Sequence, residues 1–285
     1  MIVCSISTIP GRLESLITIL TRLLESTIYP DIIIITIANY YPRLNKFYSS
    51  DEMSKLLSYL QTYKINTKIT YQDVDIGPVV KIKSALEYWN NLKKSSEDDI
   101  NEKEDVIIIL DDDSGLYEKS IELLTDAYIK HGDGVYGIMG KIGNDTYVHG
   151  EFLSSVGKEY TNVDLLGGYR GVLYPIHLLK KNDTGTTSPA TKSSKKITFF
   201  EWIDMFIKYH KKKNLIAMHD DDIFYYWAKY NNIERRVVKV PCDIPNFIYY
   251  NPINNTNGIF NDKDCNIALD MIKETLKENK LEHLI

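Results

Sequence analysis

Cysteine is scarce in this chain of 285 residues. Cys4, Cys242 and Cys265 lie far apart and form no CxxC pair. Neither a zinc site built from thiolates nor the disulfide framework of a small secreted protein is therefore expected. This sparse use of cysteine is typical of a protein from a reducing compartment.

Long apolar runs are also missing, and none approaches the roughly 20 residues that a membrane-spanning helix requires. The sequence passes from Met1 directly into a β-like segment, residues 2–6, without a basic leader or a small-residue cleavage site. We therefore expect no signal peptide and no transmembrane segment. The expected location is the cytoplasm, which for a viral protein is that of the host.

The chain also lacks an excess of positive charge. Its 34 basic and 39 acidic side chains give a net charge of -5. A protein that binds nucleic acid generally presents a positive field to the phosphate backbone. We therefore expect no nucleic-acid partner. The remaining composition, 44% hydrophobic and 26% charged, is that of a globular protein with a large core, which excludes disorder and collagen-like repeats.

Hydrophobic periodicity in the first half alternates between strands and helices. Four segments are β-like, and between them apolar residues recur at helical spacing in three more. The strand segments are residues 1–9, 32–37, 65–71 and 106–110, and the helical segments are residues 13–24, 53–60 and 78–89. Because the strands are apolar on both faces, the pattern predicts an α/β fold with a mostly parallel sheet and helices on both sides.

The second half is less regular. We expect a helix over residues 116–129, a strand over 135–139 and a helix over 199–209. Two polar segments, 93–105 and 180–196, are expected to be surface loops and not domain linkers. The simplest organisation is one domain, 1–285, with a nucleotide-binding-like first half and a second half that shapes a substrate site.

Three acidic residues, Asp111, Asp112 and Asp113, directly follow the apolar strand segment 106–110. Carboxylates grouped at the end of a buried strand repel one another and are costly to desolvate, which favours a bound cation. Oxygen ligands suit Mg²⁺ or Mn²⁺, and open α/β sheets bind ligands at this end of their strands. The alternative is a polar turn that caps the next helix.

A second acidic run, residues 220–222, opens an amphipathic helix. Acidic side chains stabilise a helix N-terminus, but capping explains one of these residues and not three. A further carboxylate beside a bound sugar can act as a general base. His219 adjoins the run and is a candidate ligand at a site that binds a metal and a diphosphate. For residues 220–222, helix capping and general-base catalysis are therefore both possible interpretations at this point.

Three weaker segments carry residues suited to a nucleotide sugar. Residues 7–12 and 73–81 each join a strand to a helix, where hydroxyls, backbone N–H groups and basic side chains attract phosphates. Residues 165–174 combine glycines with tyrosines, which suits a sugar. A helix cap, a solvated lysine and a glycine-rich hairpin are the alternatives. The candidates are Thr8, Pro10, Arg12, Asp75, Gly77, Lys81, Gly168, Tyr169, Arg170, Gly171 and Val172.

Taken in this order, the motifs STIPGR, DIGPVVK, the strand-borne DDD, GGYRGVLY and DDDIF cover nearly the whole chain. Together they resemble a GT-A-fold glycosyltransferase, similar to small enzymes of bacteria, algae and large DNA viruses. The resemblance implies a Rossmann-like domain of the nucleotide-diphosphosugar transferase type. Residues 1–115 would bind the nucleotide sugar and residues 116–285 the acceptor.

The resemblance also implies roles for single residues. Asp111 and Asp113 would flank a DxD motif around Asp112, one near the ribose and the other on a Mn²⁺ or Mg²⁺ ion. Asp222, the acid just before the hydrophobic residue of the motif, is the best match to the catalytic base, followed by Asp221 and Asp220. Related motifs often carry Glu-Asp at this place, and the run of three aspartates leaves the alignment open by one position. The nucleotide sugar would be lined by Thr8, Pro10, Arg12, Asp75, Gly77, Lys81 and residues 111–113, and the donor sugar and acceptor by residues 168–172.

The function predicted is metal-dependent transfer of a hexose from a nucleoside-diphosphate sugar, specifically a UDP-sugar, to a hydroxyl of a glycan or another acceptor, with inversion. One alternative is a haloacid-dehalogenase-like phosphatase, which also holds Mg²⁺ with a strand-end DxD. The residues that follow here, Ser114 and Gly115, depart from its motif. Another alternative is a non-catalytic sugar-binding module, which needs the tyrosines and glycines but no intact acids.

Overall fold

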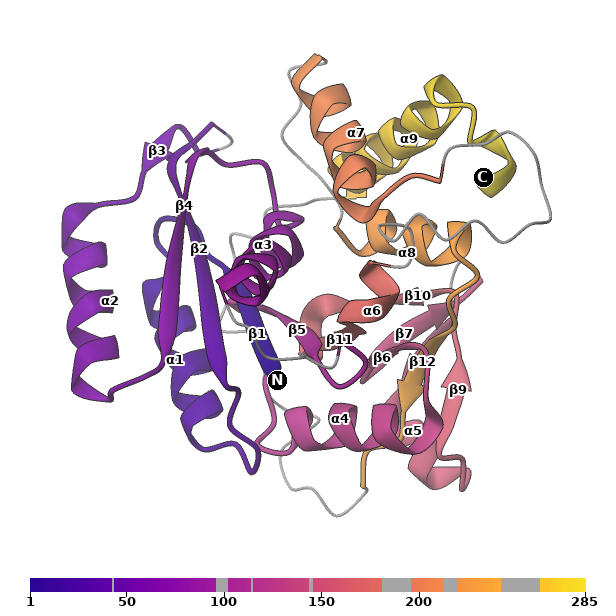
Figure 1. Ribbon diagram of the computed structural model, residues 1–285, viewed down its shortest axis with the longest axis horizontal. Coiled ribbons are helices and arrows are strands. Elements are labelled where there is room, and N and C mark those ends of the chain that lie inside the picture. The colour runs from indigo at the N-terminus through magenta and orange to yellow at the C-terminus, as the bar shows by residue number, and fades with distance from the viewer. Residues whose placement is uncertain are drawn as a thin grey trace.

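The computed structural model describes residues 1–42, 44–95, 102–113, 115–143, 146–180, 196–212, 220–241 and 262–285. A large twisted sheet runs through its centre (Figure 1). The strands of this sheet are β1 (Ile2–Ser7), β2 (Ile32–Tyr41), β3 (Lys46–Phe47), β4 (Thr67–Val74), β5 (Val106–Asp111), β6 (Val135–Gly137), β9 (Tyr160–Asn162), β11 (Val172–Pro175) and β12 (Arg235–Val238).

The order of the strands is β3-β2-β1-β5-β11-β6-β12-β9, and β4 pairs with β2. The long strands β1, β2, β4 and β5 are parallel to their neighbours in this group, as the alternation of strands and helices predicted. β11 is inserted between β5 and β6 and is antiparallel to both. The α/β fold class with its mostly parallel sheet is confirmed.

Helices cover both faces of the sheet (Figure 1). In β5, Ile107 and Ile109 belong to one hydrophobic cluster while Ile108 and Leu110 belong to the other, because successive side chains of a strand point to opposite faces. One cluster includes residues of α3 (Val80–Ser95), α7 (Phe199–Lys212), α8 (Asp220–Tyr230) and α9 (Asp262–Glu278), and the other includes residues of α1 (Leu13–Leu24), α2 (Ser50–Thr62) and α4 (Ser120–His131).

The strand expected over residues 135–139 is wrong in its extent, since β6 ends at Gly137 and the chain turns into a second sheet. That sheet consists of β7 (Met139–Ile142), β8 (Thr146–His149) and β10 (Leu165–Leu166). A Cβ on Gly140 would lie 2.7 Å from the carbonyl oxygen of Leu165, so the glycine permits the close pairing that holds the second sheet together.

Two helix starts also differ from expectation. α4 begins at Ser120 and not at 116, although Leu116 is buried in the core. α3 begins at Val80, because residues 78–79 form a turn after Gly77. The loop expected over 93–105 overlaps the end of α3, and residues 96–101 and 181–195 lie outside the described part of the chain. Among the described residues, no helix combines the length and apolar character needed to cross a membrane.

The segment 165–174 is not a plain hairpin. It consists of β10, one turn of 3-10 helix (Gly168–Arg170) and β11. β11 pairs with β5 and thereby brings the 3-10 turn next to the end of that strand. Two short helices, α5 (Gly150–Ser155) and α6 (Ile176–Leu179), complete this part of the fold.

Candidate active site

The two acidic runs meet at the carboxyl end of β5, where a buried lysine joins them. Asp111 is the last residue of β5, and Asp220 is the first residue of α8. The Nζ atom of Lys81 lies 2.5 Å from Oδ1 of Asp111 and 3.1 Å from Oδ2 of Asp220. Lys81 thus links residues that are far apart in the sequence.

Lys81 itself is enclosed by the fold, with 1% of its side chain exposed. It stands in the first turn of α3, and its backbone carbonyl accepts a hydrogen bond from Oγ of Ser5. Burial acts to lower the pKa of Lys81, but the charges of Asp111, Asp220 and Asp221 outweigh it and raise the pKa. The structure therefore gives a permanently charged lysine under the acidic groups, and not the solvated lysine that was the alternative.

Asp112 anchors the first loop of the chain and is 4% exposed. Oγ1 of Thr8 donates a hydrogen bond of 2.7 Å to Oδ2 of Asp112, and Nη1 of Arg12 lies 2.9 Å from Oδ1. Arg12 also lies 2.9 Å from Oδ2 of Asp113. Burial raises the pKa of Asp112 to about 6, and the charge of Arg12 opposes this rise. Thr8 and Arg12, predicted for the nucleotide pocket, here hold the acidic turn.

Asp221 faces Asp111 across Gly168. The backbone N–H of Gly168 donates to both carboxylate oxygens of Asp221, at 3.1 and 3.3 Å. A Cβ on Gly168 would lie 3.3 Å from Oδ1 of Asp221 and 3.5 Å from Oδ2 of Asp111. Burial and the charges of Asp220 and Asp111 raise the pKa of Asp221 well above its ordinary value, while Lys81 acts in the opposite direction. The two carboxylates therefore border one small space.

The three residues of the second acidic run point in different directions, because successive residues of an α-helix are rotated by about 100°. Asp220 contacts Lys81 and Asp221 faces Gly168. Asp222 is half-buried, and its charge acts on Tyr226 in the next turn of α8. The geometry brings Asp221, and not the expected leading residue Asp222, toward Asp111.

The other predicted residues shape the backbone around these acids. Oδ1 of Asp75 accepts the N–H of Gly77 at 2.8 Å, and Gly77 has a φ of 85° in the turn before α3. Gly171 has a φ of 97°, and a Cβ there would lie 3.1 Å from Leu110. Pro10 and Val172 are buried and Arg170 is half-buried. His219 and the side chain of Tyr169 lie outside the described part of the chain.

Sequence reasoning missed Tyr41, which supports the first loop. Its hydroxyl donates to the carbonyl of Thr8 at 2.8 Å and accepts the N–H of Ala38 at 2.8 Å. Tyr41 is 2% exposed, although it ends the strand β2 in a polar sequence. In the sequence, the only signal was the pair Tyr40-Tyr41 shortly after the apolar residues 32–37.

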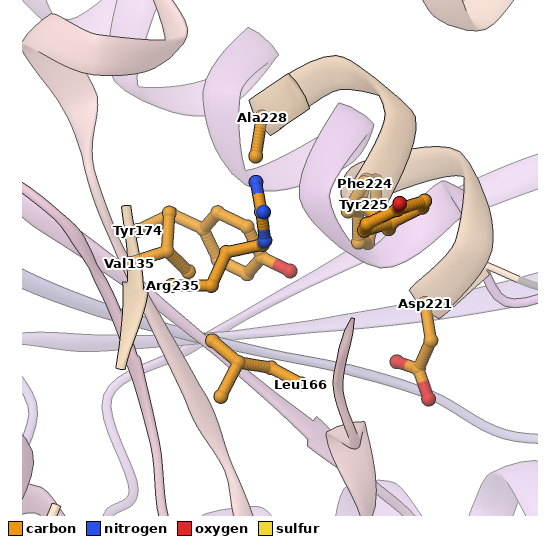
Figure 2. A pocket seen from close by; sticks show the side chains of 8 residues that line it. All are labelled: Val135, Leu166, Tyr174, Asp221, Phe224, Tyr225, Ala228 and Arg235. Carbon is orange, nitrogen blue, oxygen red and sulfur yellow. The ribbon is translucent and has the colours of Figure 1, made fainter. Parts of the chain in front are cut away.

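A small pocket next to Asp221 was also missed. It lies between α8 and the strands β6, β10, β11 and β12 (Figure 2). Its lining residues are Val135, Leu166, Tyr174, Asp221, Phe224, Tyr225, Ala228 and Arg235. Tyr174 was noted only as part of the glycine-rich segment, and no motif pointed to Arg235.

No protein-family model and no curated protein sequence matches this chain. Solved structures resemble it in fold. S. aureus TarS (residues 1–349) has a TM-score of 0.45 and 16% identity, over 82% of this chain and 57% of TarS. A mannosyltransferase from Pyrobaculum calidifontis, in complex with GDP-mannose and Mn²⁺, has a TM-score of 0.48 and 10% identity, over 84% of this chain and 54% of its own.

TarS has also been solved in complex with UDP-GlcNAc, and that structure has a TM-score of 0.40 and 17% identity, over 64% of this chain and 47% of its own. The chain thus spans about half the length of the proteins it resembles. At sequence identities of 10–17%, the similarity between these structures and this chain is one of fold alone.

The carboxylates at the end of β5 are of the kind that bind a divalent cation. In the described part of the chain, no three His, Cys, Asp or Glu side chains converge as a ready-made metal cage. Mg²⁺ and Mn²⁺ commonly use one or two carboxylates and take their other ligands from water and phosphates. Asp111 and Asp113, with 33% and 20% of their side chains exposed, offer such carboxylates at one end of β5.

Proposed function

We propose that this protein is a glycosyltransferase that moves a sugar from a nucleoside-diphosphate sugar, specifically a UDP-sugar, to an acceptor hydroxyl. The observation that carries the proposal is the approach of Asp111 and Asp221 to one space above Gly168, with the charged Lys81 beneath them. This space adjoins the carboxyl end of a central strand, where open α/β sheets bind their ligands.

The nucleotide-sugar side of the site is formed by residues 1–115. Asp111 and Asp113 would hold a Mn²⁺ or Mg²⁺ ion, which neutralises the leaving diphosphate when it is bound. Arg12 and Thr8 fix Asp112, so that the acidic turn keeps one conformation. The charge of Lys81 offsets the repulsion between Asp111 and Asp220, which keeps both carboxylates in place before the substrate binds.

Asp221 is the proposed general base. Its carboxylate takes the proton of the acceptor hydroxyl while that oxygen forms a bond to the anomeric carbon of the sugar. On the opposite face, the bond from this carbon to the diphosphate oxygen breaks, so the configuration inverts. The N–H of Gly168 donates to this carboxylate and orients it.

The test is release of nucleoside diphosphate. The protein is incubated with Mn²⁺ and with UDP-GlcNAc, UDP-glucose or GDP-mannose, and with para-nitrophenyl phosphate as a phosphatase substrate. We expect slow release of UDP or GDP from one donor, loss of this release in Asp111→Asn, and full release in Asp126→Asn, which alters an exposed residue of α4. Release of phosphate from the monoester, or no release from any donor, would contradict the proposal.

A further inference from the structure

The second sheet has one face in the core and one face toward solvent. Residues that are directly opposite each other in antiparallel strands share a face, and so do residues two positions apart in one strand. Gly140, Val148 and Leu166 therefore form the inner face, where Val148 and Leu166 belong to the hydrophobic core. The outer face, which we call the platform, is formed by Met139, Lys141, Tyr147, His149 and Leu165.

Tyr147 presents its ring to solvent on this platform, with 62% of the residue exposed. Nζ of Lys141 lies 5.0 Å from the centre of the Tyr147 ring. The ring of His149 lies 6.5 Å from that of Tyr147, and the two ring planes differ by 34°. A single exposed aromatic residue is common on protein surfaces and requires no ligand, but here two rings and a cation lie side by side.

The platform begins beside the proposed active site. The N–H of Gly167 donates to the carbonyl of Met139 at 3.1 Å, and a Cβ on Gly167 would lie 2.9 Å from Cε of Met139. The next residue, Gly168, donates its N–H to Asp221. The strand β10 of this sheet also contacts α8, which carries Asp221 (Figure 1). The rest of the platform follows within about 7 Å along the strands, the length of two strand residues.

The chemistry of the platform fits a saccharide. A pyranose ring has a face of C–H groups, which packs against an aromatic ring, and hydroxyls at its edge, which form hydrogen bonds. Tyr147 and His149 offer ring faces, and their polar atoms and the ammonium group of Lys141 offer hydrogen-bonding partners. The contact between Lys141 and Tyr147 also stabilises the pairing of β7 with β8, as cross-strand pairs do. That structural role leaves most of the tyrosine exposed.

We propose that the platform binds the acceptor, and that this acceptor is a chain of at least two sugar units. The terminal unit, which carries the attacking hydroxyl, lies at Asp221, and a preceding unit stacks on Tyr147 beside Lys141 and His149. A monosaccharide reaches Asp221 without contacting Tyr147, so the platform selects acceptors by length. The acceptor role rests on the proposed function, whereas saccharide binding at Tyr147 does not.

The first experiment measures saccharide binding without any donor. The chain has six histidines, so carbon–proton correlation spectra contain few histidine ring signals. The His149 signal is assigned by its loss in His149→Gln. Cellotriose, maltotriose, mannotriose and N-acetylated chitotriose are then titrated separately, each beside the monosaccharide from which it is built. The exposed His283 supplies the control signal.

We expect the His149 signal to shift and saturate at millimolar concentrations of one trisaccharide, and its monosaccharide to bind at least tenfold more weakly. The His283 signal should not saturate. Tyr147→Ala should weaken trisaccharide binding about tenfold, whereas Tyr147→Phe keeps the ring and should bind like the wild type.

Two results would show that the proposal is wrong, whether or not the protein releases UDP. One is a His149 signal that saturates with no trisaccharide, and the other is a Tyr147→Ala variant that binds as tightly as the wild type. Saturation at His149 together with no release of UDP would contradict the transferase function and leave the saccharide site in place.

The second experiment links the platform to transfer. The trisaccharide that binds and its monosaccharide serve as acceptors for a donor that the protein hydrolyses. Tyr147→Ala should raise the KM for the trisaccharide about tenfold with little change in kcat, and should change the KM for the monosaccharide less than about twofold. Tyr63→Ala is the matched control, because Tyr63 is 55% exposed and follows α2. An equal effect of Tyr147→Ala on both acceptors would indicate a purely structural role and overturn the proposal.

Discussion

Nζ of Lys81 lies 2.5 Å from Oδ1 of Asp111, so that a lysine with 1% exposure is paired with the acid that ends the central strand β5. The same ammonium group reaches Asp220 at the start of α8. The internal cation therefore connects β5 and α3 to the helix that carries Asp221. Its loss would remove a buried positive charge that both carboxylates contact.

We predict that Lys81→Met lowers the free energy of unfolding by about 3 kcal/mol. The substitution removes the positive charge that compensates the buried carboxylates for their lost hydration. The estimate is at the lower end for such pairs, since Asp111 is one-third exposed. Lys83→Met is the matched control. Lys83 pairs with the exposed Asp204, so its loss should cost at most about 1 kcal/mol in urea unfolding. Equal effects of the two substitutions would show that Lys81 has no special structural role.

The pKa of Asp112, raised to about 6 by burial, predicts a pH dependence of stability. A group whose pKa is higher in the folded than in the unfolded state stabilises the protein at low pH, and this contribution is lost as the pH rises through the folded pKa. The unfolding free energy of the wild type relative to Asp112→Asn should therefore fall by about 2–3 kcal/mol between about pH 4 and about pH 7.

Urea unfolding of both proteins at several pH values checks this prediction. The variant Asp126→Asn, at an exposed position, should follow the wild type at every pH. A difference between the wild type and Asp112→Asn that stays constant, or that grows with pH, would mean that Arg12 and Thr8 compensate fully for the burial of the carboxylate.

Gly168→Ala tests the space between the two facing carboxylates. Gly168 has no positive φ, so its backbone accepts alanine, but the new methyl group would lie 3.3 Å from Asp221 and 3.5 Å from Asp111. We expect a thermal midpoint close to that of the wild type and a loss of turnover on the order of a hundredfold from misplaced reacting groups. Gly134→Ala, whose nearest contact is 3.4 Å, should keep its activity. Full activity of Gly168→Ala would mean that the reaction takes place elsewhere.

Metal dependence is tested by the affinity for UDP, measured by calorimetry with Mn²⁺ and with a chelator. We expect Mn²⁺ to strengthen UDP binding at least tenfold, and Asp113→Asn to abolish this gain while UDP binding without metal stays the same. Asp126→Asn should behave like the wild type. An unchanged gain in Asp113→Asn would assign the metal to other ligands.

The sequence predicted the sheet well because of a simple physical signal. Residues 106–110 are apolar without alternation, which requires a strand covered on both faces, and Ile107 and Ile108 indeed belong to different hydrophobic clusters. The split of the strand expected over 135–139 could not be predicted in the same way. It depends on the close approach of Gly140 to Leu165, a contact between distant segments.

The acidic runs were found from their positions in the sequence, but their partners were not. Helical spacing placed Lys81 in the first turn of α3 without indicating that its side chain is buried under Asp111 and Asp220. The sequence does not show which of the adjacent residues Asp221 and Asp222 faces Asp111. The structure shows it, because the helical rotation of α8 points their side chains in different directions. Arg235 belongs to no motif, because its position is defined by the packing of α8 against β12.

The central claim is that Asp221 is the catalytic base, and the most direct measurement compares Asp221→Asn with Asp222→Asn in release of UDP from the preferred donor. Asparagine keeps the size and much of the capping ability of aspartate but cannot accept the proton. We predict that Asp221→Asn lowers turnover by about 10²–10⁴-fold with UDP and Mn²⁺ affinity unchanged, and that Asp222→Asn stays near the wild type. Turnover within a few-fold of the wild type in Asp221→Asn would contradict the account.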